Sequence, residues 1–127
     1  LSNGAVMLMH RHEASHYSAS VVRLSARAAE LKPGYWYHVV GTFSQQQGMA
    51  IYINGKLVAM DPTLNRPSDF GVHFIGAGGR RGPEQMVDHF NGSIDEVRIY
   101  RRELTPAEIR SHFEQSRPAS GLDEEFN

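Results

Sequence analysis

The clearest hydrophobic pattern in the chain surrounds the dipeptide Asn54-Gly55. Apolar side chains alternate with other residues over 49–53, and a second apolar run follows over 57–60. Alternation of this kind predicts β-strands, and Asn-Gly tolerates the positive φ angles that a two-residue type I′ turn requires. The pattern therefore predicts an antiparallel β-hairpin with Asn54 and Gly55 at its tip.

Other stretches also carry strand-like patterns. Residues 35–43 are rich in aromatic and β-branched side chains on both faces, which predicts a central strand of a sandwich. A long strand is expected over 90–100, with Val97 and Ile99 on one face. Shorter strands are expected over 5–10, 17–25 and 72–77, and 26–31 is interpreted as strand or extended chain.

The pattern changes to that of a helix after residue 104. Thr105 is a typical N-cap, Pro106 suits the first helical position, and Glu108 lies three residues past the cap, where it can close a capping box. The helix should end near Ser116, before Pro118. Two i, i+4 pairs are expected along it: Ile109 with Phe113, and Arg110 with Glu114.

The composition is that of one globular domain. The chain has 127 residues, 40% hydrophobic and 21% charged, which suits a modest core and argues against disorder. We expect residues 1–117 to form the domain and 118–127 to be a polar, acidic tail or linker. The formal net charge of -1 provides no field that would attract nucleic acid or an anionic membrane.

Several classes of chemistry are excluded by what the sequence lacks, although the compartment is not fixed by it. It has no cysteine, which removes disulfides, thiolate chemistry and cysteine-ligated zinc. No apolar run is long enough to span a membrane, and no signal peptide is visible at the first residues. The chain also begins without Met. We therefore expect no membrane insertion, and we expect the chain to be covalently part of a larger multidomain protein.

Three segments, in this order and spacing, form a family pattern. They are 36–43 (WYHVVGTF), 51–56 (IYINGK), and 90–100 (FNGSIDEVRIY) followed by 104–109 (LTPAEI). Together they resemble the laminin G-like branch of the concanavalin A-like lectin/glucanase superfamily and, more distantly, the pentraxins. The resemblance implies an all-β, antiparallel jelly-roll β-sandwich with one short C-terminal helix.

The resemblance covers about Gly34 to Phe113, which is only part of a complete family domain. Complete members begin with several more strands, here absent or reduced to residues 5–10. The chain thus looks like the C-terminal two-thirds of such a domain, N-terminally incomplete, with sheet edges left open. Two alternatives stand: the missing strands lie upstream in a parent chain, or the sandwich is abridged.

Catalysis is tested by the positions of the carboxylates. Glycosidases of this superfamily carry a Glu-x-Asp-x-x-Glu arrangement on one strand, which places two carboxylates on the same face. The sequence has no such motif: Asp95 and Glu96 are adjacent, and on a strand they would point to opposite faces. The resemblance implies instead that these two residues bind backbone or cap turns. We therefore predict that the chain is not an enzyme.

Calcium is the candidate metal, because it takes carboxylate, amide and carbonyl oxygens gathered from loops. The pentraxins, by resemblance, draw calcium ligands from the loop before the last long strand. Here that loop offers Glu84, Gln85 and Asp88, although Gly79, Arg80 and Arg81 replace the acidic cluster that the pentraxins carry early in this loop. A calcium site and a solvated loop both remain open.

Histidine and aromatic residues provide weaker candidates. His10, His12 and His16 have zinc-like spacing, but no third ligand is convincingly placed, which favours a solvated turn. Trp36 could stack on a sugar, but its place in the family pattern implies a core position. His38 is interpreted as a structural histidine in the 35–43 strand.

The resemblance implies a non-catalytic carbohydrate- or ligand-binding, adhesion-type module of a larger exported or cell-surface protein. Its partner would be a glycan or an extracellular protein, and its location extracellular, periplasmic or at the cell surface. The alternative is a structural accessory sandwich that packs against a neighbouring domain, itself possibly an enzyme, without its own ligand. An enzyme fragment is the third hypothesis. The sequence does not specify the ligand.

Overall fold

The computed structural model describes residues 6–11, 21–26, 31–65, 75–76, 78–79, 86–87 and 89–116. Two longer antiparallel sheets and one helix make up most of it. The β1–β2 pair and the β3–β4–β5 meander are separate sheets, and the very short β6 and β7 pair with each other. The elements are β1 (Val6–Arg11), β2 (Val21–Ala26), β3 (Val39–Ser44), β4 (Gly48–Ile53), β5 (Lys56–Asp61), β6 (Gly78–Gly79), β7 (Met86–Val87) and α1 (Pro106–Ser116).

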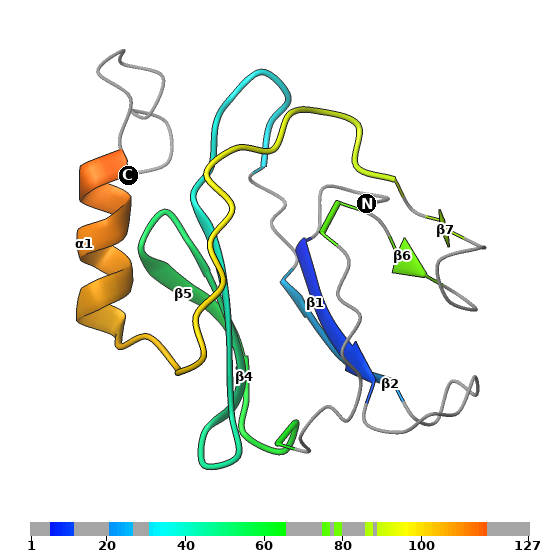
Figure 1. The fold of residues 1–127 in the computed structure, drawn as a ribbon, viewed down its shortest axis with the longest axis vertical. Coiled ribbons are helices and arrows are strands. Elements are labelled where there is room, and N and C mark those ends of the chain that lie inside the picture. Colours follow the sequence, from blue (N-terminus) through cyan, green and yellow to red (C-terminus); the bar gives the residue numbers. More distant parts are fainter. Residues whose placement is uncertain are drawn as a thin grey trace.

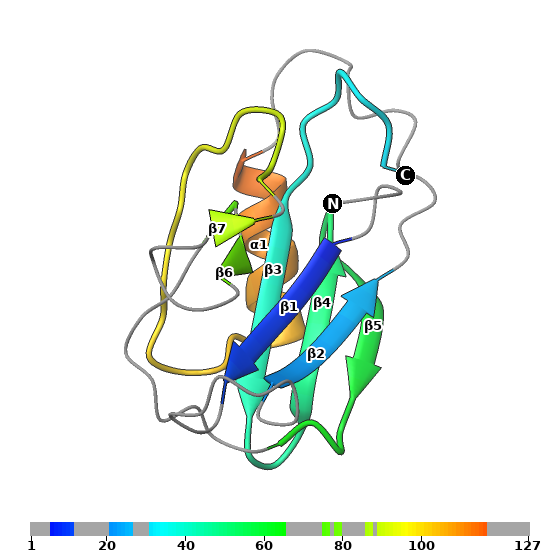
Figure 2. The same cartoon turned by 90° about the vertical axis from the view of Figure 1, so that its right-hand side faces the viewer.

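The β1–β2 hairpin and α1 lie on opposite sides of the β3–β4–β5 sheet (Figure 1). Figure 2 shows β1 and β2 in front of this sheet and α1 behind it. Val6 of β1 packs against the buried side chains of β4, which joins the two sheets through side-chain contact. The result is two layers of antiparallel sheet with a short helix on the outer side.

The core of the described structure is the inner face of β4. Met49, Ile51 and Ile53 are each 0% exposed and, as alternate residues of one strand, share one face. Burying an aliphatic side chain of this size stabilises the fold by about 1.5–3 kcal/mol. The partly buried hydrophobic side chains that pack against them are Val6, Leu31, Tyr37, Phe43, Ala59 and Leu64.

The predicted hairpin is confirmed at its tip. Asn54 and Gly55 have φ angles of 48° and 77°, and they connect β4 to β5 with Ile53 paired to Lys56. Both central φ angles are positive, as a type I′ turn requires. The register then shifts, so that Val58 is an extra residue in β5 and forms a bulge.

The predicted helix is also confirmed. The Thr105 hydroxyl accepts a hydrogen bond from the Glu108 N–H at 3.2 Å, and the Glu108 carboxylate accepts one from the Thr105 N–H at 2.7 Å. This reciprocal pair is a capping box. The helix ends at Ser116. We expected an ion pair between Arg110 and Glu114. The described residues do not form it.

The strand predicted over 35–43 is shorter and lies elsewhere in the sheet. It begins only at Val39, and among the described strands β4 is central while β3 is at an edge. Trp36 precedes the strand and is 51% exposed, so the expected core position is wrong. Aromatic and β-branched content indicated a strand correctly, but strand content does not determine which neighbours a strand acquires.

The long strand predicted over 90–100 is not formed. Residues 89–104 follow an irregular path that Figure 2 shows on the β3 side of the sheet, away from β5. The Phe90 N–H donates to the Gly76 carbonyl at 2.6 Å, and no strand ladder includes the segment within the described residues. Ile75 and Gly76, in the range predicted as a strand over 72–77, form a bend instead. A strand needs a hydrogen-bonded neighbour, and the sequence pattern does not provide one.

Candidate functional site

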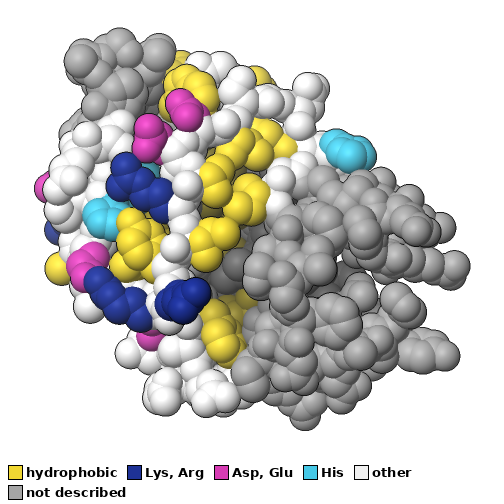
Figure 3. Space-filling view, in the orientation of Figure 1, with side chains coloured by type: hydrophobic (Ala, Val, Ile, Leu, Met, Phe, Trp, Pro, Cys, Tyr) yellow, Lys and Arg dark blue, Asp and Glu magenta, His cyan; other side chains and the backbone are white. Residues whose placement is uncertain are grey.

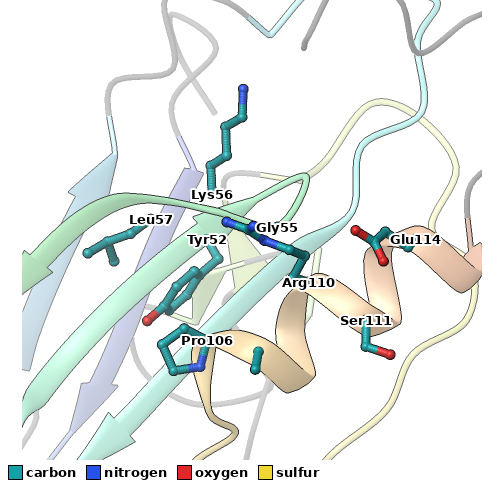
Figure 4. A pocket seen from close by; sticks show the side chains of 9 residues that line it. Tyr52, Gly55, Lys56, Leu57, Pro106, Arg110, Ser111 and Glu114 are labelled. Carbon is teal, nitrogen blue, oxygen red and sulfur yellow. The ribbon is translucent and has the colours of Figure 1, made fainter.

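An open groove lies along the contact between the β4–β5 hairpin and α1 (Figure 4). Its volume is about 650 Å³. One wall comes from the hairpin and the other from successive turns of the helix. The lining residues are Tyr52, Gly55, Lys56, Leu57, Pro106, Ala107, Arg110, Ser111 and Glu114.

The hairpin wall is fixed by Asn54, which is only 7% exposed. Its side-chain Oδ1 accepts a hydrogen bond from the His38 N–H at 2.9 Å, and its own N–H donates to the His38 carbonyl at 2.8 Å. Because both bonds use the backbone of one residue, they lock the tip of the hairpin to the chain just before β3. A buried polar side chain satisfied in this way holds its geometry closely.

The helix approaches the hairpin tip because residue 55 has no side chain. A Cβ added to Gly55 would lie 3.3 Å from Phe113 Cδ1 and 3.4 Å from Arg110 Cα. Gly55 therefore meets two requirements at once, a positive φ and close contact with α1. The width of the groove at this end depends on that contact.

The other end of the helix is fixed by its first turn. Arg102 makes two hydrogen bonds to the Glu108 carboxylate, at 2.7 and 3.0 Å, in addition to the capping box. The Arg102 guanidinium and the Thr105 N–H lower the pKa of Glu108 from 4.5 to about 2. Leu104 and Ile109 are buried on either side of the cap. The first turn is thus held by packing and by polar contacts.

The groove combines an apolar wall with charge. Figure 4 shows the Tyr52 ring beside Pro106, with Leu57 further along the hairpin. Arg110 extends from α1 toward the hairpin tip, which explains why it does not pair with Glu114. Aromatic and proline surfaces bind apolar faces of ligands, and cations bind anionic or polar groups.

A second surface feature is an exposed hydrophobic strip in segment 89–104. Figure 3 shows hydrophobic side chains gathered in the middle of one face, with basic side chains beside them. The exposed fractions reach 75% for Ile99 and 54% for Val97. We call the set the apolar strip; its members are Phe90, Ile94, Val97, Ile99 and Tyr100.

Asp95 and Glu96 lie within this exposed segment. The Asp95 carboxylate accepts a hydrogen bond from the Glu96 N–H at 2.8 Å, and Glu96 pairs with Arg98 at 3.1 Å. Glu96 has a φ of 52°, a conformation that few residues other than glycine adopt. The predicted backbone-binding role of Asp95 is seen here, but the reasoning from opposite faces of a strand was wrong because no strand forms.

His38 occupies a half-buried position between the sheet and the helix. Its ring lies 6.1 Å from the Phe113 ring, and its Nδ1 atom is buried without a hydrogen-bond partner. Burial lowers the pKa of His38, and the nearby charges of His112 and Arg98 lower it further. Packing and backbone hydrogen bonds make it a structural residue in this position.

The predicted metal ligands cannot be placed relative to one another. Glu84, Gln85 and Asp88 lie outside the described residues, before and after the two residues of β7. His12 and His16 also lie outside them, and His10 is described only as part of β1. Across the described ranges, no three His, Cys, Asp or Glu side chains come together as a metal site.

Sequence reasoning missed the groove itself. Tyr52 was interpreted mainly as a packed strand residue, although a surface tyrosine could stack on a sugar, Lys56 lies in the predicted hairpin pattern, and Arg110 was expected to pair with Glu114. The hairpin and the helix were both predicted, but 44 residues lie between Asp61 at the end of β5 and Pro106 at the start of α1, and nothing local indicates that the two elements touch. The signal that could have suggested contact is Gly55, since a glycine at a turn tip leaves room for another element.

The two antiparallel layers and the outer helix define a lectin-like β-sandwich. A laminin G-type family model, described as the concanavalin A-like lectin/glucanases superfamily, matches residues 4–110. The chain belongs to this family, and its fold is the all-β, antiparallel jelly-roll sandwich with one short helix. The predicted family and fold class are confirmed.

Relatives and a similar structure accompany this match. Adhesion G-protein coupled receptor D1 of Homo sapiens is 35% identical over 82 residues, and that of Bos taurus 32%. Each alignment covers 64% of this chain and only 9% of the receptor. The crystal structure of an S-layer domain-containing protein from Clostridium thermocellum ATCC 27405 has a TM-score of 0.57 and 24% identity, covering 87% of this chain and 52% of that one.

Within the described residues, no helix has both the length and the apolar character needed to cross a bilayer. The described helix, α1, has 11 residues.

Proposed function

We propose that this chain is a non-catalytic recognition module of adhesion type within a larger extracellular or cell-surface protein. The groove between the hairpin and α1 is its ligand-contacting surface. The observation that carries the proposal is the groove's combination of a Tyr52–Pro106 wall with the cations of Lys56 and Arg110. Family membership and the adhesion receptors among its relatives support this setting.

The carboxylates of the groove support binding rather than hydrolysis. Glu114 is the single carboxylate among the described residues that line it. Two-carboxylate glycoside hydrolysis needs a second, about 5–9.5 Å away. Asp95 and Glu96 are instead engaged with backbone and with Arg98. We infer that the ligand is a glycan or an extracellular protein that is bound and released unchanged.

The test is an array of glycans and extracellular matrix proteins probed with the purified chain. We expect binding to at least one class, and a loss of at least tenfold for Tyr52→Ala combined with Arg110→Ala. Arg101→Ala, which changes an exposed arginine outside the groove, is the matched control and should bind as the wild type does. A folded chain that binds nothing on the array would refute the proposal.

Calcium is a separate part of the proposal and rests on the pentraxin resemblance alone. We infer that Glu84, Gln85 and Asp88 contribute oxygen ligands to one calcium ion. A bound ion stabilises the folded state according to its concentration and affinity. Thermal melts with millimolar calcium and with a chelator should therefore differ, and the difference should vanish in a variant with all three residues changed to Ala. Equal melting temperatures for the wild type would retire the site.

A second candidate function is the accessory sandwich that packs against a neighbouring domain. The apolar strip favours it, because contiguous exposed hydrophobic side chains typically mark a protein contact. This function predicts a chain silent on the array. It also predicts that Val97→Asp with Ile99→Asp reduces self-association of the isolated chain without lowering its melting temperature. Array binding lost only in groove variants would reject it.

A further inference from the structure

His38 contacts both elements that form the groove. Its backbone N–H donates to the Asn54 side chain at 2.9 Å, and its carbonyl accepts from the Asn54 N–H at 2.8 Å, at the hairpin tip. Its ring centroid lies 6.1 Å from that of Phe113 on α1. Phe113 is also the side chain nearest to Gly55, since its Cδ1 atom would lie 3.3 Å from a Cβ added there. A movement of the His38 ring therefore affects the contact that holds α1 against the hairpin.

The ring of His38 is packed in a way that suits only its neutral form. Its Nδ1 atom is buried and has no hydrogen-bond partner among the described residues. In the neutral ring Nδ1 can remain an acceptor, but in the protonated ring both nitrogens carry a hydrogen and act as donors. A buried donor on a charged ring, left without an acceptor, costs much more free energy than an unused lone pair. The packed arrangement therefore disfavours the protonated ring.

The charged groups around His38 act in the same direction. Burial lowers its pKa most, and His112 of α1 and Arg98 of segment 89–104 lower it further. Arg98 already pairs with Glu96 at 3.1 Å, and the hairpin tip faces His38 with the neutral amide of Asn54. Among the groups of the described structure that shift this pKa, none is a carboxylate. The surroundings of His38 thus repel a further positive charge.

We propose that the His38–Phe113 contact is a pH-sensitive junction between the hairpin and α1, which opens when the His38 ring takes up a proton in a mildly acidic medium. Exposing Nδ1 to water accommodates the proton, separates the ring from Phe113 and loosens α1 against Gly55. Release of a ligand from the groove is a further consequence, and it rests on the proposed function. The opening of the junction does not.

The direction and the size of the effect follow from the proton balance. In the closed arrangement the pKa of His38 is lowered from 6.5, whereas a ring exposed to water has the ordinary value. The closed arrangement therefore keeps its full stability well above pH 6.5 and loses stability relative to the open one as the pH falls below 6.5. Because one proton is involved, one pH unit below 6.5 changes the opening equilibrium by at most about tenfold.

Amide hydrogen exchange of the full chain at pH 7.5 and pH 5.5 tests the junction. Each rate is divided by the intrinsic rate at the same pH, so that the protection of each amide can be compared between the two conditions. Exchange reports the local opening of one element separately from global unfolding. We expect the protection of the α1 amides to fall by about threefold to tenfold at pH 5.5, while the amides of Ile51 and Ile53 in β4 keep theirs.

Variants of His38 connect the response to one proton. His38→Phe keeps an aromatic ring for Phe113 and the backbone bonds to Asn54, but it cannot be protonated. Its α1 protection should be equal at both pH values. His38→Gln is a second variant without a titrating ring, in case phenylalanine disturbs the packing. The matched control His89→Gln removes an exposed histidine of segment 89–104 and should retain the full response.

Three results would overturn the proposal. They are equal α1 protection of the wild type at both pH values, an equal fall of protection in α1 and β4, and a response that persists in both His38 variants. On the ligand array, wild-type binding should weaken at pH 5.5 and His38→Phe binding should not. An array without any ligand would refute the proposed function and leave the exchange result standing.

Discussion

The hairpin–helix half of the molecule and segment 89–104 were equally clear in the sequence, yet only the first is built as its pattern predicts. In the hairpin–helix half, Ile51 and Ile53 are fully buried, and the turn and the cap have the expected geometry. In segment 89–104, Val97 and Ile99 are more than half exposed and no strand forms. The two regions differ in what their structure depends on.

The turn and the helix depend on residues close in sequence. Asn54 and Gly55 need only their own φ angles, and Thr105 and Glu108 satisfy each other across three residues. A strand depends on a neighbour that may be far away in the chain, and β3 provides an edge that segment 89–104 does not pair with. Local chemistry is therefore read reliably from sequence, whereas pairing is not.

The largest expected difference between the two regions concerns matched isoleucines. Ile51→Ala should lower the free energy of unfolding by about 4 kcal/mol, because it leaves a cavity in the core. Ile99→Ala should change it by no more than about 0.5 kcal/mol, because Ile99 is 75% exposed. Denaturant unfolding of both variants measures the contrast. Similar losses in the free energy of unfolding would mean that segment 89–104 is packed in solution, and the contrast between the two regions would then be wrong.

The next largest effect concerns the hairpin tip. Gly55→Val should cost about 3 kcal/mol, because a β-branched residue resists a positive φ and its Cβ would press on Phe113 and Arg110. Gly34 is a matched control with a φ of 90° and no atom within 4 Å of an added Cβ, so Gly34→Val should cost only about 1 kcal/mol of strain. Thermal melts of both variants provide the comparison. Equal losses of stability in the two variants would mean that the contact between Gly55 and α1 does not contribute to the effect.

These contrasts show how much of the fold the sequence predicts. The pattern located β1, β2, the hairpin and both ends of α1 to within a few residues. It wrongly placed Trp36 in the core and residues 90–100 in a strand. The reason is that aromatic and alternating residues give the same sequence pattern at the edge of a sheet, at its centre and in an exposed segment. The groove depends on contact between Gly55 and α1, which no local pattern encodes. The calcium ligands Glu84, Gln85 and Asp88 remain a prediction.

A smaller effect is expected at the helix cap. Thr105→Ala should lower the free energy of unfolding by about 1 kcal/mol, because the Glu108 N–H loses its acceptor. Thr105→Ser retains the hydroxyl and should recover most of the loss. Denaturant unfolding measures both variants. A Thr105→Ala variant as stable as the wild type would mean that tertiary contacts, not local capping, determine where α1 begins.

The smallest effect concerns the junction of the two regions, where Arg102 of segment 89–104 binds Glu108 of α1. The folded state lowers the pKa of Glu108 from 4.5 to about 2, so it favours the ionised carboxylate. The stability from this carboxylate is therefore fully present above pH 4.5 and is lost as the pH falls toward 2.

Wild type and Glu108→Gln should accordingly differ in melting temperature at pH 6 and converge as the pH approaches 2. Glu96→Gln is the control from within the exposed segment. The Glu96 and Arg98 side chains that form its ion pair are 71% and 61% exposed. Exposed ion pairs contribute little to the free energy of unfolding. If Glu96→Gln instead lowers the melting temperature at pH 6 as much as Glu108→Gln does, segment 89–104 is held by its own polar contacts. The distinction between a locally specified half and an unpaired segment would then give way to two regions that are both locally fixed.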